Sequence, residues 1–131
     1  MLEDKAVILC VDDEENPLVL RRLVLEEAGY DVITASSAAE ALAIVSTRRV
    51  DLVLSDHVMP GSTGAELARQ IKAAWPSLPV ILLSGLNEIP AGAESADLFL
   101  SKVEGPVILC ETIAAVLSDH NGRRNHDSLT V

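Results

Sequence analysis

The chain has 131 residues, of which 49% are hydrophobic and only 2% aromatic, and its formal net charge is −10 at pH 7. This length and hydrophobic content indicate one globular domain with an aliphatic core, and they exclude a chain that is disordered throughout. The acidic excess argues against direct binding to nucleic acid, whose phosphates attract clustered lysines and arginines, and is typical of a solvated acidic surface.

The cysteines and the N-terminus favour a reduced, cytoplasmic setting. Cys10 and Cys110 both lie inside apolar runs, without the spacing of a metal or redox motif, so we expect free thiols. The N-terminal residues lack the pattern of a secretory signal. Apolar runs stay well below the roughly 18 residues that span a membrane, so we expect no membrane contact.

Five short apolar runs predict the strands of a sheet. They cover residues 6–11, 31–35, 52–54, 80–83 and 98–100. Four of the runs are uninterrupted rather than alternating, which is typical of strands covered on both faces. The run at 31–35 is more polar, which predicts an edge strand.

Helix signals lie between the first three runs. Asn16 and Pro17 predict an N-cap and a first helical position, and Gly29 predicts the end of that helix. Ser37 and Glu40 have the spacing of a capping box, which predicts the start of a second helix.

Similar signals frame the later helices. Thr63 and Glu66 repeat the capping-box spacing, and the Trp-Pro pair at 75–76 predicts the end of the third helix. Residues 87–95 leave room only for a short or irregular fourth helix, because they include a proline and a glycine. The Gly-Pro pair at 105–106 predicts the start of the last helix.

Strands and helices alternate strictly, which predicts a parallel sheet with right-handed crossovers and helices on both faces. We expect a single domain over residues 1–119. Residues 120–131 lack a periodic pattern and predict a mobile C-terminal tail.

Polar residues follow four of the predicted strands. Asp12 and Asp13 follow the first, Asp56 the third, Ser84 the fourth and Lys102 the fifth. In open α/β sheets, ligands bind outside the carboxyl ends of the strands, so this topology places all five residues at one edge. Each alone has a simple explanation as a cap, a turn former or a surface charge, but their joint placement favours a functional site.

Three carboxylates at one edge need a neutralising partner. At an effective dielectric of about 20, two like charges about 4 Å apart cost about 4 kcal/mol, so protons or a cation must accompany them. Oxygen ligands suit Mg²⁺, and the absence of sulfur disfavours Zn²⁺. A carboxylate beside Mg²⁺ and a lysine can attack phosphorus to form an acyl phosphate, with the Ser84 hydroxyl bonding a transferring oxygen.

These segments resemble the receiver domains of bacterial two-component response regulators over about residues 5–119. The shared motifs are Val-Asp-Asp-Glu at 11–14, the segments 51–61, 79–85 and 96–102, and Gly64. The resemblance implies a flavodoxin-like, doubly wound, three-layer sandwich whose five-stranded parallel sheet has the order 2-1-3-4-5.

The resemblance also implies a role for each site residue. Asp56 would be the phosphoryl acceptor, and Lys102 would contact the phosphoryl group. Asp12, Asp13 and Asp56, with the backbone carbonyl of Val58, would hold Mg²⁺.

Two further residues would carry the switch, namely Ser84 and Phe99. The resemblance implies a sensor histidine kinase or phosphotransfer protein as phosphodonor and a downstream protein as target, and it leaves a homodimer open. We expect no enzyme acting on a separate substrate.

The sequence departs from the family's pattern in two places. Val103 replaces the usual proline after Lys102, so we expect a trans peptide bond there and a looser lysine loop. The stretch from Ser84 to Lys102 is short by about one helical turn. These departures keep a second hypothesis open, a phosphorylation-independent protein-binding module of the same fold. A small flavodoxin-like cofactor binder is disfavoured, because no glycine-rich phosphate loop follows the first strand.

The residues near the acceptor predict a long-lived acyl phosphate. Val58 and Leu86 lie two positions beyond the acceptor and the switch serine, where they would flank the path of an attacking water. Both are apolar and can neither orient nor activate that water, so we expect slow self-dephosphorylation.

Overall fold

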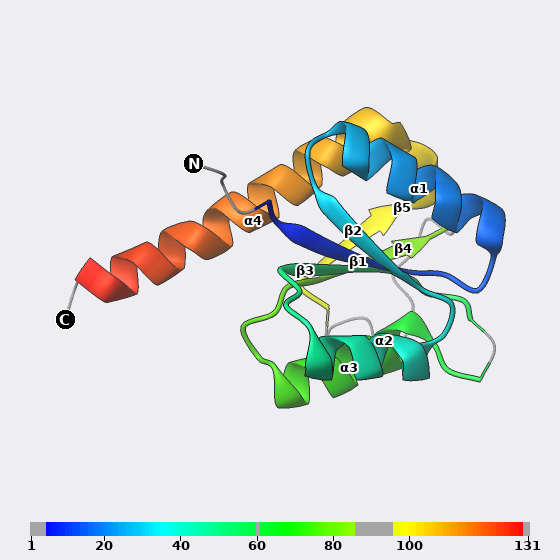
Figure 1. Ribbon diagram of the computed structural model, residues 1–131, viewed down its shortest axis with the longest axis horizontal. Helices are drawn as coiled ribbons and strands as arrows, with labels where there is room; N and C mark the ends of the chain where they lie inside the picture. The colour runs from blue at the N-terminus through cyan, green and yellow to red at the C-terminus, as the bar shows by residue number, and fades with distance from the viewer. Residues whose placement is uncertain (1–4, 60, 86–95, 130–131) are drawn as a thin grey trace.

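Five parallel strands form one sheet in this computed structural model, which describes residues 5–59, 61–85 and 96–129. The strands are β1 (Val7–Val11), β2 (Asp31–Ala35), β3 (Leu52–Asp56), β4 (Val80–Ser84) and β5 (Leu98–Ser101). They pair in the order β2-β1-β3-β4-β5, as the sequence predicts (Figure 1). Within this order β3 lies at the centre, so Asp56 at its end has a neighbouring strand on each side.

Helices cover both faces of the sheet and complete the three layers. They are α1 (Glu15–Glu27), α2 (Ala38–Thr47), α3 (Gly64–Ala74) and α4 (Gly105–Leu129), and a single 3₁₀ turn, Lys102–Glu104, precedes α4. Helices α1 and α4 lie on one face, and α2 and α3 on the other (Figure 1). The short fourth helix expected at 87–95 falls outside the described residues.

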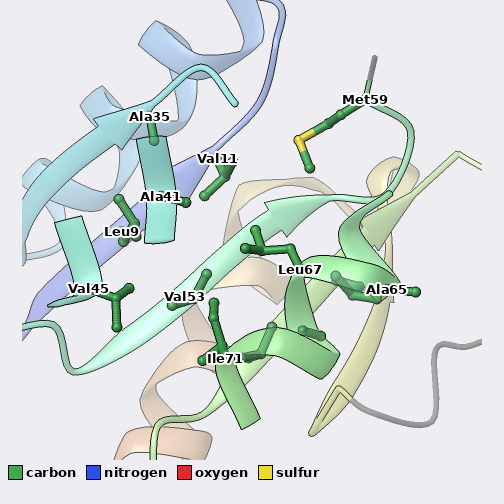
Figure 2. Close-up of a cluster of buried hydrophobic side chains, with 13 residues drawn as sticks. Leu9, Val11, Ala35, Ala41, Val45, Val53, Met59, Ala65, Leu67 and Ile71 are labelled. Atoms are coloured by element: carbon green, nitrogen blue, oxygen red, sulfur yellow. The ribbon is translucent and has the colours of Figure 1, made fainter. Parts of the chain in front are cut away.

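Two aliphatic clusters fill the space between the layers. Alternate residues of β1 point to opposite faces, so Leu9 packs toward α2 and α3 while Ile8 packs toward α1 and α4. Figure 2 shows the first cluster, with Leu67 and Ile71 of α3 against Val53 of β3. Burying each such side chain contributes roughly 1.5–3 kcal/mol to the free energy of unfolding. This packing stabilises the sheet whose strand ends bear the polar residues.

Local hydrogen bonds confirm two predicted helix starts. The Ser37 hydroxyl accepts a bond from the Glu40 N–H at 3.1 Å, and the Thr63 hydroxyl accepts one from the Glu66 N–H at 3.1 Å. Each bond satisfies a backbone donor that the first turn leaves without a helical partner.

The predicted start of the first helix is wrong, because α1 begins at Glu15 and Asn16 lies inside it. The Glu14 N–H donates to Asp12 Oδ1 at 3.0 Å, and this tight turn brings the chain into the helix early. Glu14 is the N-cap residue and makes no side-chain capping bond. The first turn of α1 thus lacks the side-chain cap that the sequence predicts from Asn16.

The backbone of residues 120–129 continues α4, a helical extension that the sequence pattern does not predict, and the mobility of the 120–131 tail stays a prediction (Figure 1). A helix that has already formed extends readily, since each added residue gains a hydrogen bond. Gly122 costs only about 1 kcal/mol relative to alanine in a helix, and no proline follows Pro106. The domain boundary at 119 stays a prediction. Among the described residues, none of the helices is both long and apolar enough to cross a membrane.

Candidate functional site

The ends of β1 and β3 bring three carboxylates together. One oxygen each of Asp12, Asp13 and Asp56 can be chosen so that all three lie within 4.8 Å of one another. Asp12 and Asp56 are buried and Asp13 is exposed, so the cluster opens to solvent on one side. The structure thus places the three acidic residues together, as the sequence predicts, and their roles stay predictions.

Lys102 reaches this cluster from the turn that follows β5. Its Nζ lies 2.5 Å from Asp56 Oδ1. The contact is an ion pair that joins the turn after β5 to the end of β3. Over the described residues the chain has no cis peptide bond, which confirms the trans bond expected before Val103. Valine in place of proline does not turn the lysine away.

The pKa of the Asp56 carboxyl lies above its ordinary value. Burial is the largest influence and raises the pKa of Asp56, and the nearby charge of Asp12 raises it further. Lys102 and Arg21 act in the opposite direction, but the pKa stays above its ordinary value. Burial and the Asp12 charge together therefore outweigh the effect of these two cations on the pKa of Asp56.

Both oxygens of Asp12 accept hydrogen bonds from the protein. Oδ1 accepts from the Glu14 N–H, and Oδ2 accepts from Arg21 Nη1 at 2.8 Å. Arg21 projects from α1, and its side chain is only 13% exposed. Arg21 was not among the site residues predicted from the sequence. The available signal was its spacing, since Arg21 shares a helical stripe with the buried residues Leu18 and Leu25.

The loop after β3 holds the acceptor tightly against α3. The Ser55 hydroxyl donates to the Asp56 carbonyl oxygen at 2.9 Å, and the Gly64 N–H donates to the His57 carbonyl oxygen at 2.7 Å. A Cβ atom on Gly64 would lie 2.5 Å from the Asp56 carbonyl oxygen, so only glycine fits there. In the same loop the Val58 side chain is 69% exposed, and the role of its carbonyl as a metal ligand stays a prediction.

The expected switch residues lie on the two strands beyond β3. Asp56 pairs with Leu83 in the sheet register, so Ser84 lies one position further along β4 at the same edge. Ser84 is buried, and Phe99 on β5 packs against the cluster that faces α2 and α3. The switch roles of both residues stay predictions.

The donor set fits a hard cation. Its side-chain ligands are carboxylate oxygens, and Asp56 Oδ1 is buried without a hydrogen bond in the described structure. Mg²⁺ prefers such oxygens and usually keeps several waters, which the exposed side of the cluster admits. Soft sulfur ligands, which zinc often uses, are absent from this group of described residues.

Comparison with known proteins decides the family. The profile of the response regulator receiver domain matches residues 8–114. The chain belongs to this family. As a receiver domain of two-component response regulators, it is a component of phosphorelay signalling.

Curated relatives share the domain at moderate identity. Sporulation initiation phosphotransferase F of Bacillus subtilis is 34% identical over 98 residues, covering 75% of this chain and 77% of that protein. The transcriptional regulatory protein GlrR of Escherichia coli is 40% identical over 90 residues, covering 69% of this chain but only 20% of GlrR. This chain thus spans about three quarters of the Bacillus protein but only about a fifth of GlrR.

Solved structures share the fold. The response regulator TrrA of Thermotoga maritima, in complex with Mg²⁺-BeF, superimposes with a TM-score of 0.81 at 32% identity, covering 85% of this chain and 98% of that chain. A CheY-like receiver domain from Methanospirillum hungatei gives a TM-score of 0.85 at 27% identity, covering 92% and 99%.

Proposed function

We propose that this receiver accepts a phosphoryl group onto Asp56 in a Mg²⁺-dependent reaction. The observation that carries the proposal is the convergence of the Asp12, Asp13 and Asp56 carboxylates with the Lys102 ammonium at one edge of the sheet. A carboxylate in such surroundings can act as a nucleophile toward phosphorus. The donor would be a phosphohistidine on a sensor histidine kinase or a phosphotransfer protein.

Each residue of the site has a distinct task in this reaction. An oxygen of Asp56 attacks phosphorus while the phosphorus–nitrogen bond of the phosphohistidine breaks and the imidazole keeps the electron pair. Asp12, Asp13, Asp56 and the Val58 carbonyl would hold Mg²⁺, whose charge offsets that of the phosphoryl oxygens. Lys102 exchanges its contact with the acceptor for one with a phosphoryl oxygen, which stabilises the charge that develops there.

The new phosphoryl group then changes the surface of the domain. The Ser84 hydroxyl bonds a phosphoryl oxygen, and the Phe99 ring follows as the loops at this edge rearrange. A downstream protein reads the altered surface. The domain is itself modified and acts on no separate substrate, so it is a switch rather than an enzyme with turnover.

The test is phosphorylation by a small donor. We expect incubation with Mg²⁺ and acetyl phosphate to add the mass of one phosphoryl group to the intact protein, and chelation of Mg²⁺ to prevent it. Asp56→Asn should remove the gain. Asp31→Asn, an exposed aspartate at the opposite end of the strands, should keep it. Failure of the wild-type protein to gain mass with any donor would support the phosphorylation-independent binding module instead.

A further inference from the structure

A half-buried arginine contacts the acidic cluster from the side of α1. Arg21 Nη1 lies 2.8 Å from Asp12 Oδ2, and the two side chains are 13% and 0% exposed. The other oxygen of Asp12 accepts the Glu14 N–H at 3.0 Å. Each oxygen of Asp12 therefore already accepts one hydrogen bond from the protein.

The charge balance makes this arginine a competitor of a metal ion. Three clustered carboxylates face two side-chain cations, since Lys102 contacts Asp56 and Arg21 contacts Asp12. The arginine charge also acts on Asp56, whose pKa it lowers. A dication that enters the same cluster meets the repulsion of both side chains, and little water screens a buried charge.

The structure offers the guanidinium a place to move. Arg21 lines a cleft of ≈310 Å³ between α1 and the start of α4, together with Lys102 and mostly apolar residues such as Leu20, Val24 and Pro106. This cleft is the space into which a guanidinium displaced from Asp12 would turn.

We propose that Arg21 is a resident counter-cation, which holds Asp12 in the metal-free protein and must yield that carboxylate when Mg²⁺ binds. Arg21 is thus a positioning residue that sets the affinity of the metal site. The inference rests on the Mg²⁺ site of the proposed function. It predicts that the wild-type protein binds Mg²⁺ more weakly than the three carboxylates alone would allow.

Calorimetric titration of the full chain with Mg²⁺ tests the proposal. We expect Arg21→Met to bind Mg²⁺ about tenfold more tightly, because a positive charge close to the dication is removed. Arg21→Lys keeps the charge and should stay near the wild-type affinity. Arg22→Met is the matched control, since the neighbouring arginine is exposed and pairs with Glu26 at 3.2 Å, and it should leave the affinity unchanged.

A second variant separates charge from hydrogen bonding and guards against misfolding of the first. Arg21→Gln retains a donor for Asp12 but no charge, so it should also bind Mg²⁺ more tightly. Thermal melting adds a readout that needs no metal titration. With chelator present, Arg21→Met should melt several degrees below the wild type, because the Asp12 carboxylate loses its ion pair with the arginine. Saturating Mg²⁺ should reduce this difference in melting temperature.

The Mg²⁺ titrations distinguish failure of this inference from failure of the proposed function. Unchanged or weaker Mg²⁺ binding in both charge-removing variants, with normal binding by the wild type, would overturn the role of Arg21 and leave the proposed function standing. Absence of Mg²⁺ binding in every variant and in the wild type would overturn the proposed function and this inference together.

Discussion

Lys102 Nζ lies 2.5 Å from Asp56 Oδ1, although valine rather than proline follows the lysine. The contact reaches from the end of β3, past β4, to the turn after β5. It brings a positive charge to a buried carboxyl whose pKa burial has raised. This contact is one that the proposed chemistry would use.

Removing the positive charge of Lys102 should slow phosphorylation of Asp56. Lys102→Met retains most of the side-chain volume but cannot offset the charge that develops on the phosphoryl oxygens. We expect the rate of phosphorylation by acetyl phosphate, followed by intact mass, to fall about 10²–10³-fold, as when an enzyme loses one donor to a developing oxyanion. Lys5→Met, an exposed lysine outside the cluster, should react at the wild-type rate. Equal rates in the two variants would remove Lys102 from the mechanism.

Gly64→Ala should destabilise the fold and disturb the acceptor. The added Cβ would lie 2.5 Å from the Asp56 carbonyl oxygen and 2.9 Å from His57 Cα, and neither backbone atom can move freely. We expect a loss of about 1–3 kcal/mol in the free energy of unfolding, measured by urea denaturation. Gly85→Ala is the control, since its added Cβ would meet nothing within 4 Å. Similar unfolding free energies for the two variants would contradict the close approach of α3 to β3.

Cys10 should make the stability depend on alkaline pH. It is fully buried in β1, and burial raises the pKa of its thiol from about 9 to about 12. Because the folded state favours the neutral thiol, this contribution is complete below pH 9 and is lost as the pH rises from about 9 to about 12. The difference in unfolding free energy between wild type and Cys10→Val should shrink there by up to about 1.4 kcal/mol per pH unit.

The comparison with Cys10→Val isolates one group. Burial also raises the pKa of Tyr30, and both proteins retain this residue, so its effect cancels. A wild-type protein whose advantage over the variant stays constant across this pH range would show that the thiol is not held away from solvent.

The sequence predicts a slowly decaying acyl phosphate. Val58 lies in the loop after the acceptor and is 69% exposed, so water can reach it. Its apolar side chain cannot activate that water. The sequence assigns Leu86 to the same path, and that residue lies outside the described structure. Replacing both by asparagine and lysine should speed loss of the phosphoryl group several-fold, measured by mass after the donor is removed. An unchanged half-life in the double variant would refute the assignment.

The fold and the acidic cluster were accessible from the sequence because both depend on short-range signals. Short apolar runs mark the strands, and the residues just beyond these runs must lie at the same edge of a parallel sheet. That reasoning places Asp56 and Lys102 together without any knowledge of side-chain contacts. The caps at Ser37 and Thr63 are equally local, since each involves a residue only three positions away.

Three features depended on contacts that sequence patterns do not contain. The early start of α1 follows from the bond between Asp12 and the Glu14 N–H, which exists because the fold fixes that carboxylate. The pairing of Arg21 with Asp12 joins α1 to the end of β1, and only the arginine's place in a buried stripe hints at it. The extension of α4 to Leu129 reflects helix propagation through a polar segment without apolar periodicity.

The acceptor itself can be identified by chemical trapping. After phosphorylation with acetyl phosphate and Mg²⁺, borohydride reduces an acyl phosphate to an alcohol, and peptide mass mapping locates the reduced residue. The proposed function predicts conversion of residue 56 alone, with none when Mg²⁺ is chelated. Conversion at Asp12 or Asp13 in place of Asp56, or at no aspartate in a protein that binds Mg²⁺, would contradict it.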